Sequence, residues 1–238
     1  MADESDFDFD IDISEIDFGL DGLDLDFDTD YSGAPDDNKI VLPKLGPPQK
    51  VKYENARTMA RQLDLVKNAN YYAMVSGNFI LGDIIEAWAD KHRFKNISVA
   101  TLGMGVNNVD SLINCLYKGA AQVNLIVSVY FFGVERHRLI RYISEEIQGL
   151  PFRVAVARSH CKIILLETDD LHITVHGSAN LSSNNSLEQI SITENKELFN
   201  FNMAIFNDIL EKQTIMDGAG VNLKNARAAK DTWEVVNG

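Results

Sequence analysis

From Val51 onward, the chain alternates between two patterns of apolar residues. Short, almost continuously apolar runs such as NISVATLG and QVNLIVSVYFF predict buried strands. Between them, segments such as LGDIIEAWADKH and NNVDSLINCLYKG carry apolar residues three and four positions apart, which predicts amphipathic helices. Apolar strands that alternate with such helices indicate an α/β domain, with a mostly parallel or mixed sheet covered by helices on both faces.

The pattern changes at the end of a further predicted strand, FRVAVARSH, which is expected to carry His160. Lys162–Glu167 and Leu171–His176 then read as the two strands of a hairpin, and NKELFNFNMAIFNDILEK reads as a last helix. The predicted domain therefore spans residues 51–212. Residues 213–238 are mostly polar and predict a flexible C-terminal tail, with Trp233 as a partial anchor.

The acidic residues are concentrated at the N-terminus. Residues 1–38 hold 15 of the 35 Asp and Glu residues and no Lys or Arg, so 20 acidic and 22 basic residues remain in the rest of the chain. The segment alternates Asp with Phe, Ile and Leu, which predicts a disordered acidic-hydrophobic arm. The arm has three readings: a solubilising tail, a mimic of nucleic-acid charge that covers a basic groove, or a peptide that docks on a protein partner. Residues 39–50 are Pro-rich and predict a linker.

The remaining composition limits the protein class. Cys115 and Cys161 lie in apolar sequence, which predicts two buried free thiols or, alternatively, one disulfide. Neither belongs to a Cys/His ligand cluster, so no metal and no cofactor are expected. The N-terminus lacks the features of a signal peptide, and no apolar run approaches the roughly 18 residues of a membrane helix. A cytoplasmic protein without a membrane partner is expected.

The segment from Ser159 to Glu188 carries the groups that a phosphodiester-cleaving site needs. On a strand, His160 and Lys162 would point the same way, so an imidazole and an ammonium would face one phosphate. Gly177 permits a tight turn, and Ser178 and Asn180 supply neutral donors. A later carboxylate, Glu188, is placed to orient the imidazole by accepting a hydrogen bond from its far nitrogen.

This ordered set resembles the motif of the phospholipase D superfamily, which reads His-x-Lys-x4-Asp, then Gly-Ser-x-Asn, then a downstream Glu. The matching positions are His160, Lys162, Gly177, Ser178, Asn180 and Glu188. The resemblance covers residues 51–212. It implies metal-independent phosphodiester cleavage, with His160 forming a phosphohistidine, Lys162 and Asn180 holding the phosphate, Ser178 assisting and Glu188 orienting the histidine.

Two positions depart from that motif. Glu167 stands where the family has Asp, and strand parity turns it away from His160, so a supporting role is expected. The segment from Glu167 to Gly177 is also longer than the family's spacing, and a longer hairpin is expected to alter the rim of the site.

The family mechanism uses two histidines, but this sequence has a single His-x-Lys motif. Single-motif members that resemble this chain work as homodimers and are mostly nucleases, which favours DNA or RNA as the substrate. The resemblance thus implies a homodimeric nuclease in which His160 of each subunit takes one role. A non-catalytic nucleic-acid-binding or scaffold protein is the alternative, and phospholipid hydrolysis is third.

Other conspicuous residues have simpler interpretations. His172 and His176 are about 13 Å apart on a strand and cannot share a metal ion, so they are expected to be exposed hairpin residues. Two basic clusters, Arg136–Arg141 and Lys91–Lys95, are typical of solvated helix faces, with nucleic-acid backbone contact as the other reading. The remaining aromatic residues of note are expected in the core or an interface rather than in base stacking: Tyr71, Tyr72, Tyr130, Phe131 and Phe132.

Overall fold

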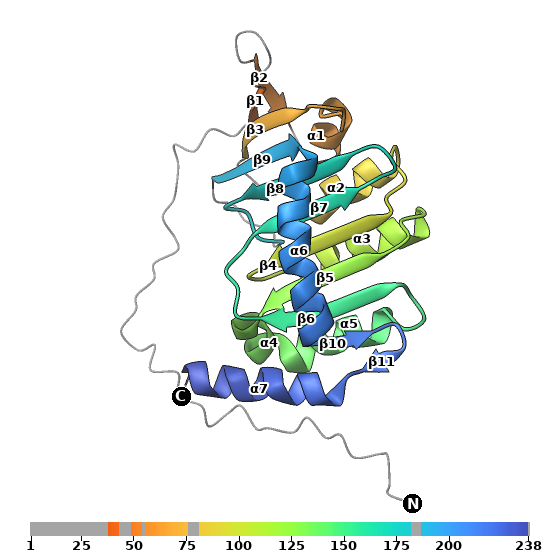
Figure 1. Ribbon diagram of the computed structural model, residues 1–238. Coiled ribbons are helices and arrows are strands. Elements are labelled where there is room, and N and C mark those ends of the chain that lie inside the picture. The colour runs from red at the N-terminus through yellow and green to blue at the C-terminus, as the bar shows by residue number, and fades with distance from the viewer. Residues whose placement is uncertain (1–37, 43–48, 54–55, 76–80, 182–186, 238) are drawn as a thin grey trace, which may run out of the picture. The chain divides into compact units, whose positions relative to one another are not determined.

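The computed structural model describes residues 38–42, 49–53, 56–75, 81–181 and 187–237, all within one compact unit, Pro35–Gly238 (Figure 1). Apart from Asn38, the predicted acidic arm lies outside the described residues. The strands are β1 (Asn38–Leu42), β2 (Gln49–Tyr53), β3 (Asn70–Val75), β4 (Asn96–Thr101), β5 (Val123–Ser128), β6 (Phe152–Ala157), β7 (Ile163–Glu167), β8 (His172–Gly177), β9 (Glu188–Glu194), β10 (Thr214–Asp217) and β11 (Gly220–Val221). The helices are α1 (Ala56–Gln62), α2 (Leu81–Ala89), α3 (Val106–Tyr117), α4 (Val129–Glu135), the π-helix η2 (Arg136–Ile140), α5 (Arg141–Glu146), α6 (Lys196–Gln213) and α7 (Leu223–Asn237).

The described strands form one 11-stranded sheet in the order β11-β10-β6-β5-β4-β7-β8-β9-β3-β1-β2. Within it, β4, β5 and β6 pair in parallel, and the other described neighbours pair antiparallel. The predicted α/β fold is therefore confirmed, and of the two expected sheet types, mostly parallel or mixed, the sheet is of the mixed type. The predicted hairpin supplies part of the reason, because the short segment Thr168–Leu171 joins β7 to β8 and short connections join only antiparallel neighbours.

Helices cover both faces of the sheet, as expected from the sequence, but unequally. One face carries the larger core, in which β4, β5 and β6 pack against α2, α3, α4 and α5 through side chains such as Trp88, Leu112 and Phe132. On the other face α6 crosses the sheet alone (Figure 1), burying Phe199, Phe206 and Leu210 against β4 to β7. None of the helices in the described part of the chain has the length and apolar character needed to cross a membrane.

The predicted flexible tail is part of the folded domain, which corrects the boundary at residue 212. β10 pairs with β6 at the edge of the sheet, and its Ile215 and Met216 are buried in the larger core. α7 packs on α4, where the Trp233 ring lies so close to Gly133 that a Cβ there would overlap it. Residues 213–238 are mostly polar, so their composition did not reveal the few apolar side chains that anchor the segment. Similarly, β1 and β2 lie partly within the predicted linker, residues 39–50.

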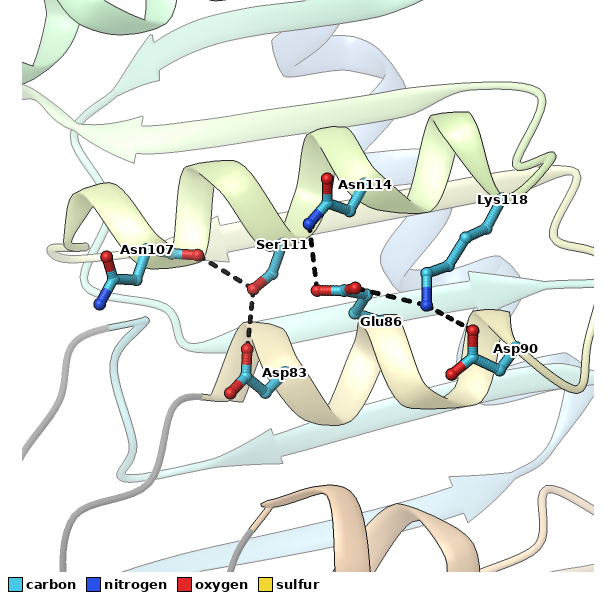
Figure 2. Close-up of polar contacts among 7 residues, drawn as sticks. All are labelled: Asp83, Glu86, Asp90, Asn107, Ser111, Asn114 and Lys118. Carbon is cyan, nitrogen blue, oxygen red and sulfur yellow. Dashed lines mark hydrogen bonds and ion pairs between the residues drawn. The ribbon is translucent and has the colours of Figure 1, made fainter.

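α2 and α3 are joined by a row of polar contacts between the two helices (Figure 2). Ser111 Oγ donates to Asp83 Oδ1 at 3.1 Å, while Lys118 Nζ lies 3.3 Å from Glu86 Oε1 and also binds Asp90. The hydrogen bond to Asp90 is the main cause of the raised pKa of Lys118, followed by burial, which lowers it, and by Glu86. Since the Glu86 side chain is 11% exposed, its carboxylate depends on Lys118 for charge compensation.

Replacing Lys118 with Met is expected to lower the free energy of unfolding by about 1–2 kcal/mol, because it leaves the Glu86 carboxylate buried without a cation. Urea unfolding measures the loss. Because the folded-state pKa of Lys118 is raised, its contacts with Asp90 and Glu86 stabilise the fold below the ordinary lysine pKa. This stabilisation is lost as pH rises through the raised pKa of Lys118. Lys212→Met, which removes an exposed pair with Asp208, is the control and should change stability little. Equal effects of the two variants would contradict the role of burial.

Candidate active site

The residues of the motif come together at one edge of the sheet. Since β7, β8 and β9 are successive antiparallel neighbours, the start of β7, the end of β8 and the start of β9 lie at the same edge. His160 and Lys162 precede β7, Ser178 and Asn180 follow β8, and Glu188 begins β9. The carboxyl ends of β4, β5 and β6 also lie there, because β4 runs antiparallel to β7.

His160 and Lys162 lie in a connection rather than on a strand, which corrects the sequence prediction. β6 ends at Ala157, and the chain then passes β5 and β4 before β7 begins at Ile163. Ser159 Oγ accepts a hydrogen bond from Cys161 N at 3.1 Å, a local turn that competes with strand pairing. His160 is exposed and Lys162 half-buried.

The two side chains still meet, because the turn brings Lys162 Nζ to 3.4 Å from His160 Nδ1. Lys162 Nζ also donates to the His160 carbonyl oxygen at 3.5 Å. Since an ammonium group only donates, its contact with Nδ1 places the proton of a neutral imidazole on Nε2. The predicted pairing of an imidazole with a cation is therefore present without the predicted strand.

Ser178 is held between the ends of β8 and β9. Its hydroxyl donates to Glu188 Oε2 and accepts from Gln189 N at 3.0 Å, and its own N–H donates to Gln189 O at 2.9 Å. Ser178 and Glu188 thus form one hydrogen-bonded unit at the site. The orientation of His160 by Glu188 stays a prediction.

Gly177 makes this close approach possible. It lies opposite Ile190 in the β8–β9 pairing, and a Cβ at this position would overlap the carbonyl oxygen of Gln189. Only glycine therefore lets β9 come near enough for the bonds between Ser178 and Gln189. The need for glycine arises from strand packing, in addition to the turn that the sequence predicted.

Asn180 is positioned by the loop that joins β4 to α3. The following residue, Leu181, bridges Met104, accepts from Gly105 N at 2.9 Å and donates from its own N to Thr101 Oγ1 at 3.3 Å. Asn180 Oδ1 is buried and has no hydrogen-bond partner among the described residues. The sequence prediction missed Thr101 and Gly105, although the sequence TLGMG after an apolar run marks a tight strand-to-helix connection.

The cavity beneath these residues is too small for a phosphate ester. Its volume is about 10 Å³, room for about one water molecule. Lys162 and Gly177 line it together with apolar residues of the larger core such as Val175 and Ile190.

Glu167 and the hairpin turn lie away from this edge. Glu167 ends β7 opposite His172, about 13 Å along the strand from Ile163, and its carbonyl oxygen accepts from Lys95 N at 2.7 Å. This position removes Glu167 from phosphate contact. The expectation that the longer hairpin alters the rim of the site was wrong, because the turn of an antiparallel hairpin that begins at the site edge lies at the other edge.

The two histidines of β8 differ in their surroundings. His172 is half-buried, and its ring contacts Phe199 edge-on at 5.3 Å between centroids, so its predicted exposure was wrong. His176 is exposed and immediately precedes Gly177. Within the described ranges, no group of three or more His, Cys, Asp or Glu side chains is arranged to hold a metal ion.

The predicted basic clusters are largely engaged within the protein. Arg138 pairs with Glu135 at 3.0 Å, and this hydrogen bond raises the pKa of Arg138. Arg136 is buried, with its guanidinium 5.2 Å above the Trp233 ring. The other pairs are Arg141 with Glu145, Lys91 with Asp64, and Lys95 with Asp169. The predicted solvation was therefore wrong for Arg136, whereas the other pairs favour the interpretation as ordinary helix and loop surface.

The two cysteines are both free, but they are not both buried as predicted. Cys115 is buried, and burial raises the pKa of its thiol to about 12. Cys161 is exposed, between His160 and Lys162. The turn after β6 carries Cys161 out of the sheet, which explains the difference from the prediction.

Under native conditions, a maleimide is expected to modify Cys161 and leave Cys115 unmodified, because alkylation needs an accessible thiolate. The added group would separate His160 from Lys162, so the phosphodiester cleavage that the motif predicts should be lost. Mass spectrometry locates the adduct, and Cys161→Ser provides an active, maleimide-resistant control. Full activity after complete modification of Cys161 would contradict the position of this segment in the site.

Solved structures similar to this chain include Nuc from Salmonella typhimurium, described as a phospholipase D family member. It is 17% identical, with a TM-score of 0.42, over 56% of this chain and 87% of that chain. NucT from Helicobacter pylori is 15% identical, with a TM-score of 0.44, over 56% of this chain and 88% of that chain. Phosphatidylserine synthase from Haemophilus influenzae Rd KW20 is 12% identical, with a TM-score of 0.40, over 75% of this chain and 51% of that chain.

The sequence matches no family model and no curated protein.

Proposed function

We propose that the protein is a metal-independent phosphodiesterase that cleaves DNA or RNA through a phosphohistidine intermediate. The observation that carries the proposal is the meeting of His160 and Lys162 with the Ser178–Glu188 unit and Asn180 at one open sheet edge. These residues come from three separate places in the chain. Together they supply a nucleophile, a cation, neutral donors and a carboxylate, which is the set that phosphoryl transfer through histidine requires.

The first step is attack of His160 on phosphorus. When a substrate phosphate attracts the ammonium group of Lys162, Nδ1 loses the contact that it has in the free site. Nδ1 then carries the ring proton, and Nε2 is free to attack. The Nε2–P bond forms as the bond from phosphorus to the leaving oxygen breaks, and a general acid gives that oxygen a proton. Lys162 and Asn180 hold the non-bridging oxygens, with Ser178 assisting.

The second step returns the enzyme to its starting state. The group that served as acid now takes a proton from water, whose oxygen attacks phosphorus and breaks the Nε2–P bond. The products are a phosphate monoester and a hydroxyl-terminated fragment. In this proposal the acid and base is His160 of a second subunit, because the motif supplies each chain with one such histidine.

Incubation of the full-length protein with single- and double-stranded DNA and RNA in excess EDTA tests this function. We expect cleavage in EDTA, together with an acid-labile covalent adduct between the protein and a nucleic-acid fragment, trapped by rapid quenching. A requirement for a divalent ion would refute the mechanism. Binding without cleavage of any nucleic acid would favour the scaffold alternative, and turnover of phospholipid vesicles alone would favour the third reading.

Deleting residues 1–38 is expected to raise affinity for nucleic acid. The deletion removes 15 acidic residues, so the formal net charge is negative in the full chain and positive in the shortened chain. The gain should be largest at low salt, where charges act over longer distances. Fluorescence anisotropy with a labelled oligonucleotide measures it across a salt series. Unchanged affinity at low salt would exclude a masking role and leave the partner-docking or solubilising reading of the arm.

A further inference from the structure

Part of one face of the sheet is left uncovered by α6 and adjoins the candidate site. This part has no role in the proposed chemistry. On this face His176, Ser191 and Tyr72 are directly opposite one another across β8, β9 and β3. It is the face that α6 covers, because Thr174, two residues before His176, pairs with Leu165 of the α6 core. α6 packs over β5 to β8 (Figure 1), and beyond it Tyr72 is 40% exposed.

Across β8, β9 and β3 this face is polar and carries no Asp, Glu, Lys or Arg; further along the sheet, Lys39 of β1 lies opposite Met74. Around the row of three lie residues that are exposed or half-buried and include no Asp, Glu, Lys or Arg: Gln189, Thr193, Met74 and Asn70. Several are hydrogen-bonded to one another, with Gln189 Nε2 donating to Ser191 Oγ at 3.1 Å and Thr193 Oγ1 donating to Asn70 Oδ1 at 3.3 Å. The Tyr72 hydroxyl donates to Met74 Sδ at 3.3 Å, which fixes the ring on the sheet.

The face begins one residue from the site. His176 immediately precedes Gly177, and Gln189 immediately follows Glu188. Neighbouring strands are about 4.8 Å apart, so Tyr72 lies roughly 10 Å from His176 across the sheet. At a rise of about 3.4 Å per nucleotide along the axis of a stacked strand, that span is on the order of three nucleotides.

We propose that this face binds the bases of a single-stranded nucleic acid whose backbone phosphate lies in the site, with Tyr72 stacking on a base and His176 contacting its neighbour. The substrate class rests on the proposed function. The paired positions of β8, β9 and β3 hold no Lys or Arg to bind phosphates, whereas their exposed rings and their amide and hydroxyl groups suit base faces and edges. A duplex keeps its bases paired and stacked inside, so the face selects single strands.

Fluorescence anisotropy in the His160→Ala background, which prevents turnover, tests this assignment at fixed salt. We expect Tyr72→Ala to weaken binding of a mixed-sequence single-stranded oligonucleotide about tenfold, and to change duplex affinity little. Tyr72→Phe keeps the ring and should keep the affinity, which guards against a folding defect in the alanine variant. Tyr117→Ala is the matched control, since Tyr117 is 72% exposed at the end of α3 distant from the site edge.

Unchanged single-strand affinity in Tyr72→Ala, or an equal loss on the duplex, would overturn the assignment. So would a variant that shifts from dimer to monomer in sedimentation with single-strand affinity intact, because the face would then belong to a second copy of the chain. The two proposals fail separately. If Tyr72→Ala weakens single-strand binding but the wild-type protein cleaves no nucleic acid, only the proposed catalysis is refuted. If the wild-type protein cleaves nucleic acid but Tyr72→Ala binds single strands normally, only the proposed base-binding face is refuted.

Discussion

Replacing His160 with alanine is expected to lower nuclease activity by about 10⁴-fold or more while leaving the fold intact. The side chain is exposed in a connection between strands, so its removal should cost little stability. In the proposed mechanism, it removes both the nucleophile and the general acid, because His160 of each subunit would take one of these roles. Single-turnover cleavage in EDTA measures the loss, and the trapped covalent adduct between the protein and a nucleic-acid fragment should disappear with it.

His172→Gln is the control for this variant. His172 lies on β8 at the other edge of the sheet, where its ring contacts Phe199, and it should retain activity near that of the wild type. If His160→Ala still cleaves at a comparable rate, the phosphohistidine mechanism fails. Specific activity should also fall on dilution, because a site that takes one histidine from each subunit is incomplete in a monomer.

Replacing Gly177 with alanine is expected to have the second-largest effect. The new methyl group would overlap the Gln189 carbonyl oxygen, a backbone atom that moves only if β9 shifts. We expect a loss of about 3 kcal/mol in the free energy of unfolding, at the upper end of the usual cost of overpacking. Activity should fall about 10²-fold beyond any loss of folded protein, because Ser178 and Glu188 would be displaced from each other.

Gly105→Ala is the matched control, since a Cβ at Gly105 would meet nothing within 4 Å, although this residue also lies at the site edge. Urea unfolding and cleavage rates under folding conditions separate the two effects. Wild-type stability in Gly177→Ala would contradict the close approach of β8 and β9. Normal stability combined with lost activity would instead place the role of this glycine in substrate contact.

The similarity between the predicted and observed elements has a local cause. In runs such as NISVATLG and amphipathic segments such as LGDIIEAWADKH, the spacing of apolar residues is recognisable from neighbouring positions alone. These two segments form β4 and α2. The β7–β8 hairpin was also predictable, because two short strands and a polar turn are consecutive in the chain. The segment after Gln213 was not, because its few anchoring side chains are scattered among polar ones and are recognised only in their contacts with α4 and β6.

By itself, the sequence determined which residues can do the chemistry: an imidazole, an ammonium, a hydroxyl, an amide and a carboxylate in a recognisable order. Tertiary structure alone decided how they meet. The turn after β6 takes His160 off its predicted strand, and the antiparallel order of β7, β8 and β9 brings three chain segments to one edge. The tertiary structure also places Glu167 and the hairpin turn at the opposite edge of the sheet, and it leaves Tyr72 exposed on the face next to the site. Strand order and exposure depend on contacts between residues far apart in the chain, and no local pattern encodes those contacts.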